Sequence, residues 1–283
     1  MATVKQFSQE FMKKFNEQNV TLLAASLAYY FLLAIFPLLI VAFAIIPYFQ
    51  ISPDDAMEFI GSIIPGELVS VFEENIVSLV ATPRGGLLTV GIIGALWSAS
   101  NGINAFIKAS NEAYDVEETR SFIVVRLIAF GLTLSLILAV VTAILLPVFG
   151  DVLLEFTISL LGINAEMTWL LQVLRYAISL IIITVLLMCL YRFAPNKRIP
   201  FKHILPGAIG ASILWQVISF GFSIYVGNFG NYSATYGSLG GIIVLMIWFF
   251  LTAIILLVGA LLSVMYHQKA TRENKEIHKA ANI

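Results

Sequence analysis

Arg175 and Gln172 are strongly polar residues inside an otherwise apolar run, three residues apart and on nearly the same face of a helix. Hydrocarbon offers a guanidinium no hydrogen-bond partner, so a charge at this place is a candidate functional group. Two interpretations stay open. The side chain either snorkels to outer headgroups, or it lines an outward cavity and holds a phosphate or carboxylate with its planar fork.

A second polar group follows a helical spacing at the end of another apolar run. It comprises Ser98, Asn101, Asn104 and Lys108, and it continues into a charged stretch that contains Glu112 and Arg120. Steps of three and four residues put these side chains on one helix face. They either bond neighbouring helices at a solvated exit or form the inner half of a substrate path, in which Glu112 and Arg120 would make a gate pair.

A third polar group lies between the last two apolar runs, where Tyr232 and Tyr236 stand among glycines and no charges. Tyrosines at a membrane edge are typical of the aromatic belt. The glycines also allow a re-entrant loop, which membranes tolerate only where protein or water satisfies the backbone. Both interpretations stay open.

Hydrolytic and metal chemistry find little support in the sequence. His203, His267 and His278 are scattered without a metal-ligand spacing, and Cys189 is the only cysteine. A net charge of −1 gives no basic field for nucleic acid, and no nucleotide-binding loop occurs. We therefore expect no enzyme, no metal, no cofactor and no nucleic-acid partner.

The elements that must position these residues are membrane helices, because 59% of the chain is hydrophobic and no Asp, Glu, Lys or Arg occurs from His203 to Gln268. About 20 apolar residues cross a bilayer as a helix. The sequence predicts an all-α polytopic membrane protein with six transmembrane helices. They cover residues 22–49, 87–107, 127–149, 169–191, 204–226 and 239–266.

The basic residues predict the orientation. The two tails and the second and fourth connections hold 14 of the 16 Lys and Arg residues, and cytosolic segments carry this excess. We expect one membrane domain over 1–283, with a cytosolic amphipathic N-tail (1–20) and a cytosolic C-tail (267–283). In the N-tail, Val4, Phe7, Phe11 and Phe15 form an apolar stripe that suits the inner membrane surface. Further amphipathic helices are expected on the outer face, within 50–83 and 152–161.

Prolines and glycines predict how the helices pack. Pro37 should kink the first helix. Gly237 and Gly241 form a GxxxG step, and Gly207 and Gly210 offer another close-approach face. Glycine-rich strings at 91–95 and 207–211 lie in spans that run in opposite directions. The similarity of these two strings raises the hypothesis of an inverted repeat of two three-helix halves.

Four stretches together resemble the YihY/BrkB family of bacterial inner-membrane proteins: Leu27–Leu39, Leu96–Phe122, Leu190–Trp215 and Tyr232–Ala260. The resemblance covers nearly the whole chain and implies six membrane helices and an activity that is poorly defined, labelled at times ribonuclease and linked at times to virulence or lipid transport. Leu261 stands where the family pattern has an acidic residue, so a charge relay at that position is not expected here.

The leading functional hypothesis is a transporter-like protein of the cytoplasmic membrane that moves a lipid, a lipid-linked molecule or another anionic amphipath. The alternative is a scaffold for envelope biogenesis that transports nothing. Membrane lipids are the expected partners, and the sequence leaves a homo-oligomer open. The ribonuclease label finds no support in the residues, because RNA hydrolysis needs clustered histidines or carboxylates and a basic groove.

Overall fold

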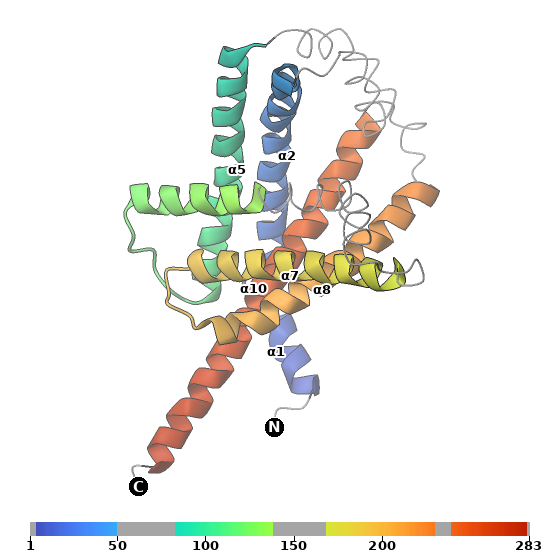
Figure 1. Ribbon diagram of the computed structural model, residues 1–283. Helices are drawn as coiled ribbons and strands as arrows, with labels where there is room; N and C mark the ends of the chain where they lie inside the picture. The colour runs from blue at the N-terminus through green and yellow to red at the C-terminus, as the bar shows by residue number, and fades with distance from the viewer. Residues whose placement is uncertain (1–3, 50–82, 138–167, 230–238, 282–283) are drawn as a thin grey trace. The chain divides into compact units, whose positions relative to one another are not determined.

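The computed structural model describes residues 4–49, 83–137, 168–229 and 239–281, and every regular element in these ranges is helical (Figure 1). The prediction of an all-helical chain is confirmed for this part. The helices are α1 (Val4–Glu17), α2 (Val20–Ile45), the short 3-10 helix η1 (Ile46–Phe49), α5 (Gly85–Ala113), an unlabelled helix Phe122–Ile137, α7 (Thr168–Phe193), α8 (Phe201–Phe229) and α10 (Leu239–Ala281).

Four of the described helices are long and apolar enough to cross a membrane. They span Val20–Tyr48, Gly85–Ala113, Phe201–Gly227 and Gly240–Arg272, and so coincide with the first, second, fifth and sixth predicted spans. The third and fourth predicted spans overlap the apolar helices Phe122–Ile137 and Leu180–Phe193. The outer amphipathic helices predicted within 50–83 and 152–161 lie almost wholly outside the described residues.

Two helices run furthest past the ends that hydropathy predicts. α5 continues from Ile107 to Ala113, and α10 continues from Tyr266 to Ala281, so that most of the predicted C-tail is helix (Figure 1). Hydropathy marks where a helix leaves apolar surroundings, but backbone hydrogen bonding continues through polar residues with good helix propensity. The N-tail is helical as its spacing predicts, and Asn19 makes the turn into α2 with a φ of 48°.

The described chain forms two compact units. The α2 unit contains Thr21–Ala105 and Ile218–Ile254, and the α7 unit contains Met1–Val20, Phe106–Val217 and Ile255–Ile283. In the α2 unit, glycines on α5 let α2 approach closely: a Cβ at Gly91 would lie 3.1 Å from Ile40 Cγ2, and one at Gly94 would lie 3.4 Å from Pro37 Cβ. α2 continues as a helix through Pro37.

The core of the α7 unit is built where α8 crosses α10. Gly207 faces Ser263, and Gly259 faces both Ala211 and the hydroxyl of Tyr191. Tyr191 is 2% exposed, stacks on Phe106 and donates a 3.0 Å hydrogen bond to the carbonyl of Leu256. Small residues at the crossing allow this approach, as is usual where lipid replaces water as solvent.

Candidate functional site

The end of α5 places a polar loop beside the end of α7. Val116 N–H donates to the carbonyl of Asn111 and Asp115 N–H donates to that of Glu112, each at 3.0 Å. These two bonds, with Asp115 at a φ of 52°, form the capping turn that commonly ends helices with glycine. Asp tolerates the left-handed conformation better than most residues. The turn directs residues 116–121 back toward the α7–α8 connection.

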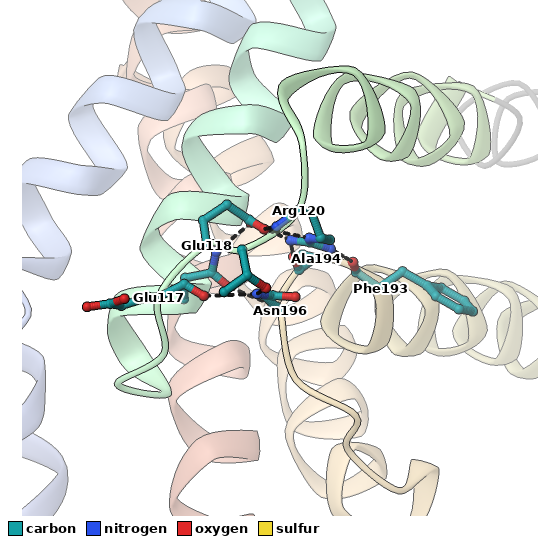
Figure 2. Close-up of polar contacts among 8 residues, drawn as sticks. Glu117, Glu118, Arg120, Phe193, Ala194 and Asn196 are labelled. Atoms are coloured by element: carbon teal, nitrogen blue, oxygen red, sulfur yellow. Dashed lines mark hydrogen bonds and ion pairs between the residues drawn. The ribbon is translucent and has the colours of Figure 1, made fainter.

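Arg120 caps the carbonyl end of α7. Its guanidinium donates to the carbonyl of Phe193 at 3.3 Å and to that of Ala194 at 2.8 Å (Figure 2). The last carbonyls of a helix lack intrahelical partners and carry partial negative charge, so a cation is favourable there. The same guanidinium holds Glu118 in a bidentate pair, with Nε–Oε1 at 2.8 Å and NH2–Oε2 at 2.6 Å.

Two asparagines complete this contact, which we call the polar junction (Asn111, Glu117–Arg120 and Phe193–Asn196). Asn111 accepts a bond from Asn196 N–H at 2.6 Å and donates to Glu118 at 2.8 Å. Asn196 donates in turn to the carbonyl of Glu117 at 2.9 Å and to the hydroxyl of Thr119 at 2.8 Å (Figure 2). The polar junction therefore ties together the loops that follow α5 and α7.

The Arg120 hydrogen bonds lower the pKa of Glu118 to about 2 from the usual 4.5, with smaller contributions from the Arg120 N–H and Asn111 and an opposing effect of partial burial. Because the folded pKa lies below the unfolded one, this carboxylate stabilises the fold fully above pH 4.5 and loses that effect as the pH falls toward 2.

We expect the stability difference between wild type and Glu118→Gln to be large at about pH 7 and to shrink toward about pH 3, because below pH 4.5 protonation of Glu118 stabilises the unfolded state while the native carboxylate stays ionised. Thermal unfolding in mild detergent measures it. Glu17→Gln is the control, since Glu17 pairs with Lys13 at 3.7 Å on an exposed face. A difference for Glu118→Gln that stays constant with pH would contradict the prediction.

A pair of histidines links the start of α8 to the end of the apolar part of α10. His203 Nδ1 and His267 Nδ1 lie 2.9 Å apart, and the ring centroids lie 5.1 Å apart. The two rings thus meet nitrogen to nitrogen and share one hydrogen bond. His203 also meets the ring of Tyr266, and His267 meets that of Tyr114.

Tyr114 closes the histidine pair from the side of α5. It is 4% exposed, burial raises its pKa, and its hydroxyl has no hydrogen-bond partner among the described residues. The ammonium of Lys197 lies 5.7 Å from the centre of its ring. The same described residues contain no group of three or more His, Cys, Asp or Glu side chains arranged to hold a metal ion.

The residues of the polar face predicted on α5 differ in how far they are buried. Ser98, Asn101 and Asn104 are half-buried, Lys108 is exposed, and the neighbouring Ser100 is buried and bonds to the carbonyl of Trp97. Asn111 extends the same three- and four-residue spacing into the polar junction. Arg120 belongs to the polar junction and pairs with Glu118, whereas the sequence suggested Glu112 as its partner; Glu112 is exposed.

The other predicted residues are placed only in part. Gln172 and Arg175 belong to α7, but their side chains lie outside the described part of the chain. Tyr232, Tyr236 and Gly237 also lie outside it, so the predictions of a loop site and of the Gly237–Gly241 step stay predictions. A Cβ at Gly210 would lie 3.5 Å from Leu262 Cδ1 on α10, which is an ordinary contact distance.

Sequence reasoning missed the histidine pair and described the histidines as scattered. The structure corrects this. His203 lies at the start of α8 and His267 lies on α10, and the two rings are in contact although sixty-three residues separate them in the chain. A signal was present in the sequence. Both histidines stand next to the ends of apolar runs, and both of these ends are predicted to lie on the cytosolic side of the membrane. Asn196 was also missed, and nothing local in the sequence marks its partners.

Comparison with known proteins matches residues 11–283 to the family described as virulence factor BrkB. A Bacillus subtilis protein, YfkH, whose name calls it ribonuclease-like, is 40% identical over 263 residues, which are 93% of this chain and 96% of that protein. UPF0761 membrane proteins of Xanthomonas campestris and Xanthomonas axonopodis are 28% identical over 93% and 91% of this chain. The chain spans about three-fifths of the length of these Xanthomonas proteins. No solved structure matches.

Proposed function

Because the chain belongs to the BrkB virulence-factor family and is a multi-pass bacterial membrane protein, we propose that it moves a lipid, a lipid-linked molecule or another anionic amphipath across the membrane. The family assignment confirms the resemblance seen in the sequence. In the same proposal the chain crosses the cytoplasmic membrane six times, with both termini in the cytosol. Membrane lipids are its proposed partners.

The observation that carries this proposal is the polar face of α5. Ser98, Asn101 and Asn104 are half-buried within a helix that is otherwise apolar enough to span a membrane. An amide inside the hydrocarbon region is costly unless protein, water or a polar ligand satisfies it. A headgroup that passes along α5 would meet these amides first and the cation Lys108 at the exit.

A transport assay tests the proposal. Purified protein in liposomes should accelerate the movement of fluorescent anionic phospholipids between leaflets, followed by chemical quenching of the outer leaflet. Replacing Asn101 and Asn104 with leucine should slow this movement about tenfold, as the loss of one ordinary hydrogen bond would. Thr89→Val is the matched control, because Thr89 lies exposed on the same helix and bonds only to the carbonyl of Gly85.

Two outcomes would contradict the proposal. One is that no tested lipid moves faster than in protein-free liposomes, which would favour the scaffold alternative. The other is an equal effect of Thr89→Val and the asparagine substitutions. The unfolding midpoint of each variant, measured in the same detergent, separates lost transport from lost folding.

We also propose that the chain is not a nuclease. His203 and His267 are close enough for acid–base chemistry, but their facing nitrogens bind each other and aromatic rings pack around them. A substrate phosphate would have to break that contact. RNA cleavage by the purified protein that His203→Ala abolished would contradict this view.

A further inference from the structure

The connection between α7 and α8 presents cations and aromatic rings together on the surface of the α7 unit. The connection and the helix ends next to it carry Arg192, Arg198 and Lys202 together with Phe193 and Phe201, and we call these five residues the Arg–Phe patch. Arg198 and Lys202 are exposed, and the two phenylalanines are 51% and 50% exposed.

Arg192 lies between the two rings of the patch. Its guanidinium carbon is 5.9 Å from the centre of the Phe193 ring and 5.8 Å from that of Phe201. Contact with ring faces within about 6 Å holds the guanidinium without using its N–H donors. The rings therefore fix the position of a cation whose donors remain available to an oxyanion.

No ion pair with an acidic side chain is seen for the cations of the patch in the described part of the chain. The sequence contains no Asp or Glu between Glu166 and Glu273. The ion pairs Lys13–Glu17 and Arg120–Glu118 do not involve the patch. Three cations outside any ion pair, with Lys197 as a fourth in the same connection, attract an anion.

The position of the patch in the chain identifies which anion reaches it. α7 carries no charge between Arg175 and Arg192, its part Leu180–Phe193 is apolar, and the membrane span of α8 begins at Phe201, so the seven residues between α7 and α8 emerge at one membrane surface. Half-exposed phenylalanines are costly in water and favourable at the boundary of acyl chains and headgroups. A guanidinium held at that depth lies level with lipid phosphates.

We propose that the Arg–Phe patch binds the headgroups of anionic phospholipids in the leaflet where the α7–α8 connection emerges. The phenylalanines insert beside the acyl chains, Arg192 grips the phosphate with two N–H donors, and Arg198 and Lys202 favour lipids with net negative charge. The inference requires only that the chain lies in a membrane. It is independent of the transport proposed for α5.

Quenching by brominated lipids tests this inference on the full chain. Phe193→Trp and Phe201→Trp place reporters in the patch, and the wild-type fluorescence of the native tryptophans is subtracted. Each variant is placed in nanodiscs of phosphatidylglycerol and phosphatidylcholine in equal amounts, with bromine on the acyl chains of one lipid or the other. Tyr48→Trp is the matched control, because Tyr48 is 50% exposed in η1, at the end of the apolar span Val20–Tyr48, and no basic residue lies near it in the sequence.

We expect brominated phosphatidylglycerol to quench both patch reporters at least about twofold more than brominated phosphatidylcholine, since each basic residue at an anionic surface favours binding by about fivefold. At position 48 the two lipids should quench equally. Combined Arg192→Gln, Arg198→Gln and Lys202→Gln should bring the patch ratio to about one. Arg192→Lys should give an intermediate ratio, because it keeps the charge and loses the fork.

Three results would overturn the inference. The first is equal quenching by brominated phosphatidylglycerol and brominated phosphatidylcholine at positions 193 and 201. The second is a quenching ratio at these positions that the charge substitutions leave unchanged. The third is a preference for phosphatidylglycerol at position 48 as large as that at positions 193 and 201. A fourth arm adds inorganic phosphate at constant ionic strength. If free phosphate erases the preference, the patch binds phosphate from solution and not a membrane headgroup; the inference requires that the preference survive.

Discussion

Gly207→Ala should destabilise the protein far more than Gly210→Ala, although the two glycines lie one turn apart on α8. A Cβ at Gly207 would overlap the hydroxyl oxygen of Ser263 and the carbonyl oxygen of Gly259, and it would lie 2.8 Å from the Ser263 nitrogen. Two of these three atoms belong to the backbone of α10. A helix backbone cannot yield as the end of a long side chain can, so α8 and α10 would have to separate.

The expected cost of Gly207→Ala is about 1–3 kcal/mol or more, the usual range for overpacking a well-packed core. A Cβ at Gly210 meets only Leu262 Cδ1 at 3.5 Å, and alanine is a better helix former than glycine, so Gly210→Ala should be neutral or slightly stabilising. Denaturant or thermal unfolding in mild detergent measures both. Equal midpoints for the two variants would show that the helices do not cross as closely as described.

Arg120→Ala should be the most damaging substitution in the polar junction. It removes the donors to the carbonyls of Phe193 and Ala194 and leaves the carboxylate of Glu118 without its cation. The guanidinium side chain is only 16% exposed, so water replaces these bonds poorly. Loss of a charged hydrogen-bonding group in such a place costs about 2–4 kcal/mol.

Arg120→Lys should fall between wild type and Arg120→Ala, because one ammonium cannot reproduce a bidentate pair and reach two carbonyls as well. Lys13→Ala is the control: it removes an ion pair whose side chains are 72% and 59% exposed, and such pairs contribute at most about 1 kcal/mol. Unfolding midpoints of the purified variants measure the order. The interpretation fails if Arg120→Ala costs no more than Lys13→Ala.

Hydropathy predicts the membrane helices well because a span is a local property of the sequence. Four spans coincide with described helices, and the polar residues of α5 lie on the helix where their spacing puts them. Helix ends were less accurate. α5 extends to a capping turn whose left-handed residue is Asp115, where the usual signal is glycine.

The contacts of the candidate site could not be predicted, because they join residues distant in the chain. Arg120 and Ala194 are separated by 74 positions, and Asn111 and Asn196 by 85. Only packing of α5, α7 and α8 brings them together, and a single sequence does not encode that packing locally. For the same reason the sequence offered Glu112 as the partner of Arg120, while the chain turn selects Glu118.

The length of α10 has a mechanical consequence. The helix continues for fifteen residues beyond Tyr266, about 22 Å at 1.5 Å per residue, and no proline interrupts it between Leu239 and Ala281. An unbroken helix transmits a change of tilt along its whole length. A tilt of about 10° within the bilayer would displace the far end by about 4 Å. Such a tilt of the apolar segment would therefore displace the charged segment that follows it.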